Sequence, residues 1–524
     1  MTSVSPIASW NAGTVRAAAT AASRVEASSL PSNTSFDTSS SIVALAAAAG
    51  PRATQATAAP LQWERASRDQ VSDLMAKNFA AQGASGRFSG LGAALLDQLK
   101  GGATQLSQTA QRAPGGVPAD TYAGLATGVS GALHGMGSDK FSLGITTRGG
   151  VEVKLSLDSD GDGLAVQMTA SGDLSEDETR ALGKLATAFQ AAIDGMAQDP
   201  PQISLGGLMQ FDSKQLASLD LRAQVGLNTE PPSVQTLSFQ ADATQRKVSF
   251  SGAAGSLDVK VDAGKPASLG SAEQQARAMK SYMGQFDQAA TRGHADGALM
   301  TLFKDTFSTL HSTVGDASQL SLGGTAPGKW QLAAQDSALL TGLADFSASV
   351  SQTPKMENPM RLSEQDAFAY EVGQSTSIGG RSIDERAISQ KQTSSLNASF
   401  HMPLVAGTSL NLTTAAESQN YTYHQIDDQA SSDANIVYQD GKLAKATLEQ
   451  SSSQSTRIQR YEMGKLKSDL TTPSEHSLLR DLVSALAPYQ AGQTHLNAEQ
   501  KAQQRTLMLR ELNDDVFLKA DAGR

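Results

Sequence analysis

The apolar residues of this chain recur at every second position from Lys140 onward, and this alternation constrains the fold more than any other feature. Successive side chains of a β-strand point to opposite faces, so alternation predicts strands with one buried and one solvated face. Turn sequences at residues 148–150 and 158–163 divide the stretch into three runs. The runs hold Phe141, Leu143 and Ile145, then Val151, Val153, Leu155 and Leu157, then Leu164, Val166 and Met168. We therefore predict a three-stranded antiparallel meander.

A helix is expected to follow this meander and to cover one face of its sheet. Ser175 and Glu178 have the spacing of a capping box, which marks the start of a helix. The apolar residues after them fall on one helical stripe, which consists of Leu182, Leu185, Phe189, Ile193 and Met196.

The same order of strands and helices returns farther along the chain. Alternating runs hold Leu237 and Phe239, then Val248 and Phe250, then Leu257, Val259 and Val261, and helices are expected from Ser271 and from about residue 295. We expect a duplicated unit, an idea that fails if the two meanders pair within one sheet. The predicted fold class is α+β, with antiparallel β-meanders each followed by packing helices, a β-rich C-terminal region and a disordered N-terminal arm.

Composition and periodicity divide the chain into seven predicted segments. The first sixty residues are rich in Ser and Ala and lack the large side chains that could offset the entropy of ordering. The segments are a disordered arm (1–60), a helical segment (61–137), a meander plus helix (138–200), a second meander plus helix pair (201–316), a linker with short strands (317–365), a polar β-rich region (366–472) and C-terminal helices (473–524).

Three helix starts follow from capping residues. Ser67, with Gln70 three residues later, is expected to cap the first helix. Thr472 and Pro473 occupy the N-cap and first-turn positions of a helix that would contain the leucines after residue 477. Asn497 is expected to cap a last helix that ends near residue 512.

Charge and cysteine content exclude several classes of protein. The chain carries 42 Lys and Arg against 52 Asp and Glu, and this net charge of -10 argues against binding to nucleic acid or to an anionic membrane. The absence of cysteine removes disulfides and thiolate metal ligands. No stretch is apolar enough for a membrane-spanning helix, and no ordinary signal peptide opens the sequence. We expect no membrane insertion, and either a cytoplasmic location or export without a cleaved signal peptide.

The polar β-rich region is where we expect a partner surface, if the protein has one. Its Ser-, Thr- and Gln-rich runs suit hairpins with at least one wet face. Tyrosines offer apolar area and a hydroxyl at small entropic cost, which is typical of contact residues, although they could instead cover the sheet as core residues. We predict that at least two of four stand largely in solvent: Tyr421, Tyr423, Tyr438 and Tyr461.

One run resembles the first half of a calcium-binding loop. Asp158, Asp160 and Asp162 occupy the first, third and fifth positions, and Gly163 takes the sixth position, where such loops turn. Thr169 stands where the bidentate Glu is required, and the flanking residues read as strands. Two interpretations follow: a polar hairpin turn, or a weak calcium site completed by acidic residues beyond the third strand.

Other catalytic patterns are incomplete. Residues 323–329 spell most of a phosphate-binding loop, but Trp330 replaces the hydroxyl residue that would reach magnesium. His424 lies near Asp427 and Asp428, but neighbouring strand residues point to opposite faces, so the two carboxylates cannot act across one bond. A basic strip of Arg457, Arg460, Lys465 and Lys467 surrounds Tyr461, and is expected to be a solubilising edge or a contact for an acidic partner.

Residues 203–225, with the sequence ISLGGLMQFDSKQLASLDLRAQV, resemble an uncharacterised family of Gram-negative bacterial proteins. The resemblance covers about the central third of the chain when the preceding helix is included. It implies a bacterial origin and carries no activity across.

We predict a non-enzymatic interaction or accessory protein that binds a protein partner through the β-rich region. Long polar strands and scattered titratable groups suit a surface better than a preorganised pocket. Two alternatives come from other classes: a hydrolase that acts on a polymer, and a secreted effector with an uncleaved N-terminal export signal. The sequence leaves the oligomeric state open.

Overall fold

One antiparallel sheet organises the described part of the chain. The computed structural model describes residues 61–65, 69–112, 133–227, 229–230, 232–264, 268–312, 314, 332–486 and 498–520. The contacts of residues 59–524 form one compact unit. The predicted disordered arm (1–60) lies outside the described residues.

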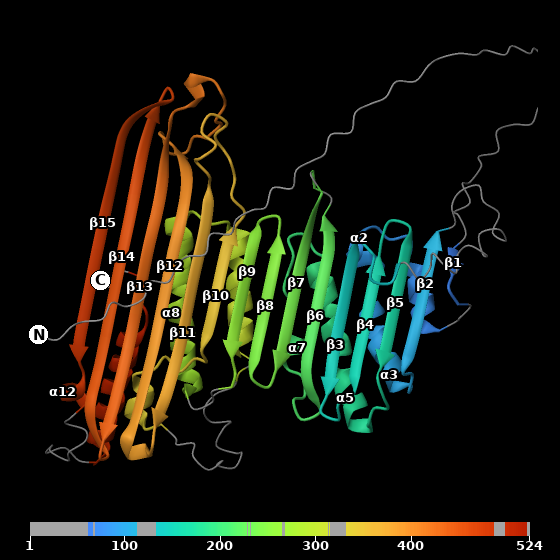
Figure 1. The fold of residues 1–524 in the computed structure, drawn as a ribbon, viewed down its shortest axis with the longest axis horizontal. Helices are drawn as coiled ribbons and strands as arrows, with labels where there is room; N and C mark the ends of the chain where they lie inside the picture. The colour runs from blue at the N-terminus through green and yellow to red at the C-terminus, as the bar shows by residue number, and fades with distance from the viewer. Residues whose placement is uncertain are drawn as a thin grey trace, which may run out of the picture. The chain divides into compact units, whose positions relative to one another are not determined.

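The sheet contains fifteen strands within the described residues, and every neighbouring pair is antiparallel (Figure 1). Their spatial order is β1-β2-β5-β4-β3-β6, followed by β7 to β15 in chain order. The strands are β1 (Leu61–Trp63), β2 (Gln105–Arg112), β3 (Asp139–Thr147), β4 (Glu152–Ser159), β5 (Gly163–Ala170), β6 (Leu216–Leu227), β7 (Ser233–Asp242), β8 (Gln245–Gly252), β9 (Gly255–Asp262), β10 (Phe346–Gln352), β11 (Ala367–Gly380), β12 (Arg386–Pro403), β13 (Tyr421–Gln439), β14 (Lys442–Glu462) and β15 (Lys465–Asp481).

The two predicted meanders lie in this same sheet. Strand β6, which was not predicted from the sequence, lies between them: it pairs with β3, from Lys140 opposite Gln224 to Thr147 opposite Leu216, and on its other side with β7. Because both meanders are parts of one sheet, the expectation of a duplicated unit is wrong. Each meander alone would leave a free strand edge, and β6 pairs with both edges.

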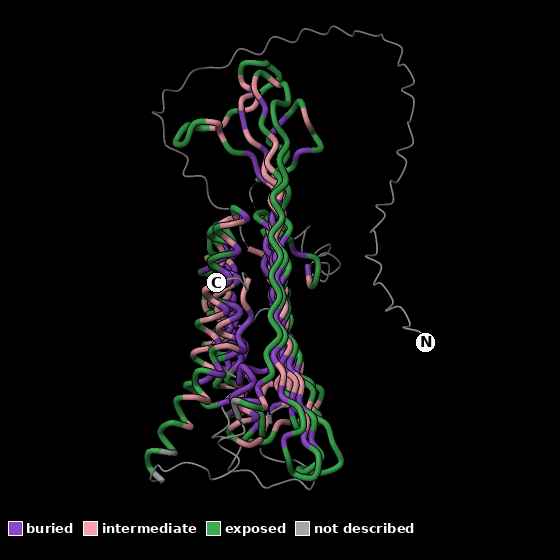
Figure 2. Tube along the Cα trace, turned by 90° about the vertical axis from the view of Figure 1, so that its left-hand side faces the viewer, coloured by how far each residue is buried: buried purple, intermediate pink, exposed green. Residues whose placement is uncertain are grey.

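Helices cover one face of the sheet and leave the other face largely open (Figure 2). Among the described residues, no helix is both long and apolar enough to cross a membrane. The helices are α1 (Gln70–Asn78), α2 (Gly83–Arg87), α3 (Leu91–Lys100), α5 (Glu176–Lys184), α6 (Ala186–Met196), α7 (Gly206–Met209), α8 (Ala272–Gly293), α9 (Gly297–Ser312), α11 (Ala334–Ala338), α12 (Val483–Leu486) and α13 (Ala498–Val516).

The core lies between this helical layer and the sheet. Of the alternating residues predicted from the sequence, Val151 precedes β4 and is half-buried, and the others are buried: Phe141, Leu143, Ile145, Val153, Leu155, Leu157, Leu164, Val166, Met168, Leu237, Phe239, Val248, Phe250, Leu257, Val259 and Val261. Ser175 and Glu178 form the predicted capping box at the start of α5. The predicted single helix is two helices, because the chain breaks at Leu185, but Leu182, Phe189 and Ile193 remain on the buried stripe.

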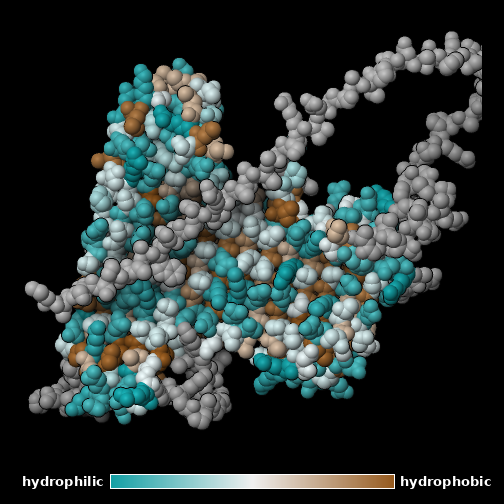
Figure 3. Space-filling model, in the orientation of Figure 1, coloured by the Kyte–Doolittle hydropathy of each residue, from teal (hydrophilic) through white to brown (hydrophobic). Residues whose placement is uncertain are grey.

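Strands β11 to β15 confirm the prediction of a polar β-rich region with a wet face. Side chains that point away from the helices are mostly exposed, and hydrophilic and neutral residues dominate this face in the space-filling view (Figure 3). All of β15, the edge strand, is exposed.

Two predicted helix starts differ from the structure. Thr472 and Pro473 lie within β15, where Pro473 pairs with Ser455, and do not begin a helix. An edge strand tolerates proline because its outer side needs no ladder hydrogen bond. The first described helix is capped by Asp69, while Ser67 and Asn497 lie outside the described residues.

Phe189 tests whether the stripe on α6 anchors the helical layer. The side chain is fully buried, so the Phe189→Ala substitution should lower the free energy of unfolding by about 3–5 kcal/mol. Thr187 is exposed on the same helix, and Thr187→Ala should change stability by less than about 0.5 kcal/mol. Denaturant unfolding measures both, and equal losses in the two variants would contradict the assigned stripe.

Candidate partner-binding groove

The four tyrosines singled out in the sequence are all buried, so the prediction that two stand in solvent is wrong. None is more than 5 % exposed. Tyr421, Tyr423 and Tyr461 form one cluster with Leu410 and Leu412, at the end of the sheet where the segments before β11 and β13 fold over it. A single-layer sheet needs such rings for its own core, and they cannot serve as contact residues without unfolding this end.

A histidine between two carboxylates fixes this end of the sheet. His401 Nδ1 lies 2.5 Å from Asp366 Oδ1, and its Nε2 lies 3.2 Å from Glu364 Oε2. The Tyr421 hydroxyl donates to the same Glu364 oxygen over 2.6 Å. The network therefore ties the segment before β11 to the ends of β12 and β13.

The same contacts set the charge of His401. Burial alone would lower its pKa, but hydrogen bonds with Asp366 and Glu364, and the charges of both carboxylates, raise the pKa to about 9. The hydrogen bond from His401 in turn lowers the pKa of Glu364, against the effect of burial. A protonated ring with two ionised partners has its polar atoms satisfied, which indicates a structural role.

Tyr438 lies at the other end of the strands, in a second buried network. Its hydroxyl donates to Asp336 Oδ1 over 2.7 Å, and Asp336 Oδ2 accepts from Arg386 Nε over 2.9 Å. The Arg386 guanidinium lies 3.4 Å from the centre of the tyrosine ring. Burial raises the pKa of Tyr438 to about 12. This network fastens α11 to the sheet.

The turn with the three predicted calcium ligands is bound by an arginine. Arg87, at the end of α2, donates to the carbonyl oxygens of Asp160, Gly161 and Gly163. Asp160 accepts from the backbone of Asp162, and Asp158 lies at the end of β4 with one carboxylate oxygen buried and unpartnered. Among the described residues, no group of three metal-ligating side chains converges, so the structure adds no support for calcium here.

The remaining sequence candidates are dispersed. His424 stacks on Phe400 and lies on the strand face opposite Tyr421 and Tyr423. Asp428 pairs with Arg292 on the helix side. Residues 323–329, the incomplete phosphate-binding loop, lie outside the described residues.

The basic strip is partly neutralised within the sheet. Arg457 donates to both carboxylate oxygens of Asp469, over 2.8 and 2.6 Å. Arg460 pairs with Glu462 over 2.7 Å. These contacts favour the interpretation of the strip as a solubilising edge over that of a partner contact.

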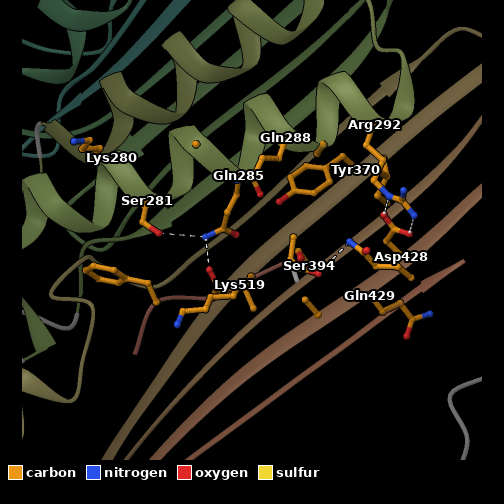
Figure 4. A pocket seen from close by; sticks show the side chains of 18 of the residues that line it. Lys280, Ser281, Gln285, Gln288, Arg292, Tyr370, Ser394, Asp428, Gln429 and Lys519 are labelled. Atoms are coloured by element: carbon orange, nitrogen blue, oxygen red, sulfur yellow. Dashed lines mark hydrogen bonds and ion pairs between the residues drawn. The ribbon is translucent and has the colours of Figure 1, made fainter. Parts of the chain in front are cut away.

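A groove of about 930 Å³ opens between α8 and the strands β11 to β14 (Figure 4). The buried side chains of Tyr370, Leu396 and Ala430 line its sheet side. One wall is α8, from Arg277 to Arg292, and the residues after α13 close the opposite side. The groove therefore combines an apolar floor with polar walls.

The end of α13 and the residues after it cross the sheet as a strap, which we define as residues 515–520. Side-chain amides and a hydroxyl of the strands, and one amide of α8, bind its main chain. Val516 O accepts from Gln392 and Ser432, Phe517 O from Gln450, Leu518 O from Gln285, Ala520 O from Gln454, and Leu518 N donates to Gln392. Because these contacts engage backbone atoms, they hold the strap largely independently of its sequence.

Positive charge dominates the lining of the groove. Its charged side chains are Arg277, Lys280, Arg292, Arg510 and Lys519, against Asp428 and Asp514. Arg292 binds Asp428 through two hydrogen bonds, and Arg277 lies 3.4 Å from Asp514. Lys280, Arg510 and Lys519 form no ion pair with any other residue in the described ranges.

One buried acceptor in the groove lacks a partner. Gln285 is buried, and its Nε2 donates to Leu518 O over 2.8 Å, which fixes the orientation of the amide. Its Oε1 has no hydrogen-bond partner among the described residues. A buried acceptor left unpaired costs about 1–3 kcal/mol, so a donor supplied by a ligand would relieve this cost.

The sequence did not single out these groove residues. Their contributing segments, α8 and the strap, are more than two hundred residues apart, and no local motif connects them. One sequence signal could have indicated this region. Gln and Ser recur at alternate strand positions, as at Gln390 and Gln392 or Gln450 and Ser452, although a buried strand face usually carries apolar residues there.

Comparisons of the chain with known protein families, with curated proteins and with solved structures gave no match.

Calcium should leave the thermal midpoint of the protein unchanged, because Arg87 already binds the carbonyl oxygens of the turn at 158–163 and places a positive charge beside it. Thermal unfolding with millimolar calcium or magnesium measures this. A rise specific to calcium that disappears in the double variant Asp160→Asn, Asp162→Asn would establish the calcium site instead.

His401→Gln should cost about 2 kcal/mol near pH 6, since it removes a charged hydrogen-bond partner of two carboxylates. The pKa of His401 is raised to about 9 in the folded state, so its contribution is complete below about pH 6.5 and is lost as the pH rises through 9. The stability difference between wild type and variant should therefore shrink over this interval.

His424→Gln is the matched control for this pH dependence, because burial lowers the pKa of His424 and it lies outside the network. Urea unfolding from pH 6 to pH 9 follows all three proteins. A constant difference between wild type and His401→Gln would show that the ring is not charged in the folded state.

Proposed function

We propose that this chain is a non-enzymatic binding protein that holds an acidic segment of a protein partner in the groove between α8 and β11–β14. The observation that carries the proposal is the presence of three cationic side chains, Lys280, Arg510 and Lys519, that line the groove without an ion pair to any described residue. A groove that already satisfied its charges would have no electrostatic preference for a ligand.

The charge of the whole chain sharpens this preference. With a net charge of -10, most of the surface repels acidic partners, whereas the groove attracts them locally. Such a contrast directs an acidic segment to one place and disfavours long polyanions such as nucleic acid, which would also meet the repelling surface. The proposal keeps the partner in the β-rich region but moves its site from the tyrosines to the groove.

The alternatives from other classes gain no comparable support. A polymer hydrolase needs two carboxylates across one bond, but Asp428 is engaged by Arg292 and Asp427 is exposed. The effector alternative concerns residues 1–60, which lie outside the described residues. The bacterial family inferred from residues 203–225 stays a prediction.

The double variant Lys280→Glu, Lys519→Glu tests the proposed function. A fluorescently labelled oligoglutamate peptide should bind wild type, and the variant should bind it at least about tenfold more weakly, a loss of about 1.4 kcal/mol. Fluorescence anisotropy at low ionic strength measures both affinities, since added salt screens the attraction.

The control is Lys442→Glu, Lys445→Glu, which makes the same charge change at exposed positions of β14 that do not line the groove. Binding should change by less than about twofold in this variant. If the control loses as much affinity as the groove variant, the attraction is a property of the whole surface and the groove is not the site.

A further inference from the structure

The strap shows that side chains on this face of the sheet bind main-chain carbonyl groups. Four consecutive carbonyl groups, from Asp515 to Leu518, accept hydrogen bonds from side-chain amides or a hydroxyl of the groove region. The donors come from three strands and from α8, so the end of α13 and the residues after it are bound across the strands by side chains and not by sheet pairing. The groove runs directly beside this strap.

The length of the groove fits a short extended segment. Its helical wall extends from Arg277 to Arg292, which is about 22 Å at the rise of an α-helix. An extended chain rises about 3.3 Å per residue, so about six or seven residues would fill this length.

The unpartnered Gln285 Oε1 favours an extended ligand over a helical one. An extended chain keeps free main-chain N–H groups, whereas the N–H groups inside a helix are already bonded to its own carbonyl oxygens.

The chemistry of the groove suggests what the ligand carries on its two faces. Side chains of an extended segment alternate in direction, so one set meets the apolar floor of Tyr370, Leu396 and Ala430. The other set points toward the walls, where Lys280 and Lys519 offer unpaired charge. The unpartnered Gln285 Oε1 can accept a hydrogen bond from a main-chain N–H.

We propose that the groove binds an extended peptide segment in which acidic and apolar residues alternate, and that part of its recognition is a main-chain N–H donated to Gln285. This inference depends on the proposed function and specifies the partner: a segment of about six or seven residues that lies beside the strap.

Three labelled peptides of equal length, each with the same number of Glu and Leu residues, test the inference. The first alternates Glu and Leu, the second places all Glu before all Leu, and the third repeats the alternating sequence with N-methyl groups on the backbone. Methylation removes N–H donors but keeps the charges and side chains. The alternating peptide should bind wild type about threefold to tenfold more tightly than each of the others, as expected for one hydrogen bond or one register of contacts.

The variant Lys280→Glu, Lys519→Glu separates the possible outcomes. Weaker binding of all three peptides to the variant, with equal affinities among them for wild type, would overturn the extended-segment inference and leave the proposed function standing. Equal binding of every peptide to wild type and variant would overturn the proposed function itself. If wild type prefers the alternating, unmethylated peptide and the double variant loses this preference, the result supports both the proposed function and the extended-segment inference.

Discussion

Burial of one face of a fifteen-stranded antiparallel sheet is the constraint on which the rest of this structure depends. An amphipathic sheet must cover its apolar face, and the helices between the strands supply that cover. Pairing β3 with β6 extends the sheet and brings both meanders under one helical layer. The result is one large core that includes Val71 and Leu518, with two smaller clusters in the C-terminal part of the sheet.

The side chains buried between the sheet and its covering helices become more polar toward β15, and the proposed binding site follows from this difference. Beneath the N-terminal helices the buried strand residues are mostly apolar, whereas Gln390, Gln392 and Gln450 are buried beneath α8, α13 and the strap. Buried amides require partners, and the strap supplies backbone carbonyls to Gln392 and Gln450. The groove is the part of this polar region that the chain leaves unfilled.

Local patterns suffice where a signal depends on neighbouring residues. Alternation identified β3 to β5 and β7 to β9 with most of their buried residues, and the Ser175–Glu178 box identified the start of α5. Alternation did not identify β6, nor β1 and β2, which lie in the segment predicted to be helical (61–137). The prediction of a helix at Thr472 was wrong, because the Thr-Pro sequence that can begin a helix is also tolerated in an edge strand. The tyrosines were predicted to be exposed but are buried. The sequence shows that a strand has two faces, but it does not show which loops cover each face.

The sequence by itself determined the α+β class, the amphipathic strands, the polar character of the C-terminal region and the acidic net charge, since these are properties of composition and spacing along the chain. Only the tertiary structure decided which charges stay unpaired and which meet. Lys280 and Lys519 line one groove, and His401 meets Glu364 and Asp366, because strand pairing brings together residues that are distant in sequence. No local pattern encodes such contacts, as they depend on the register of the whole sheet.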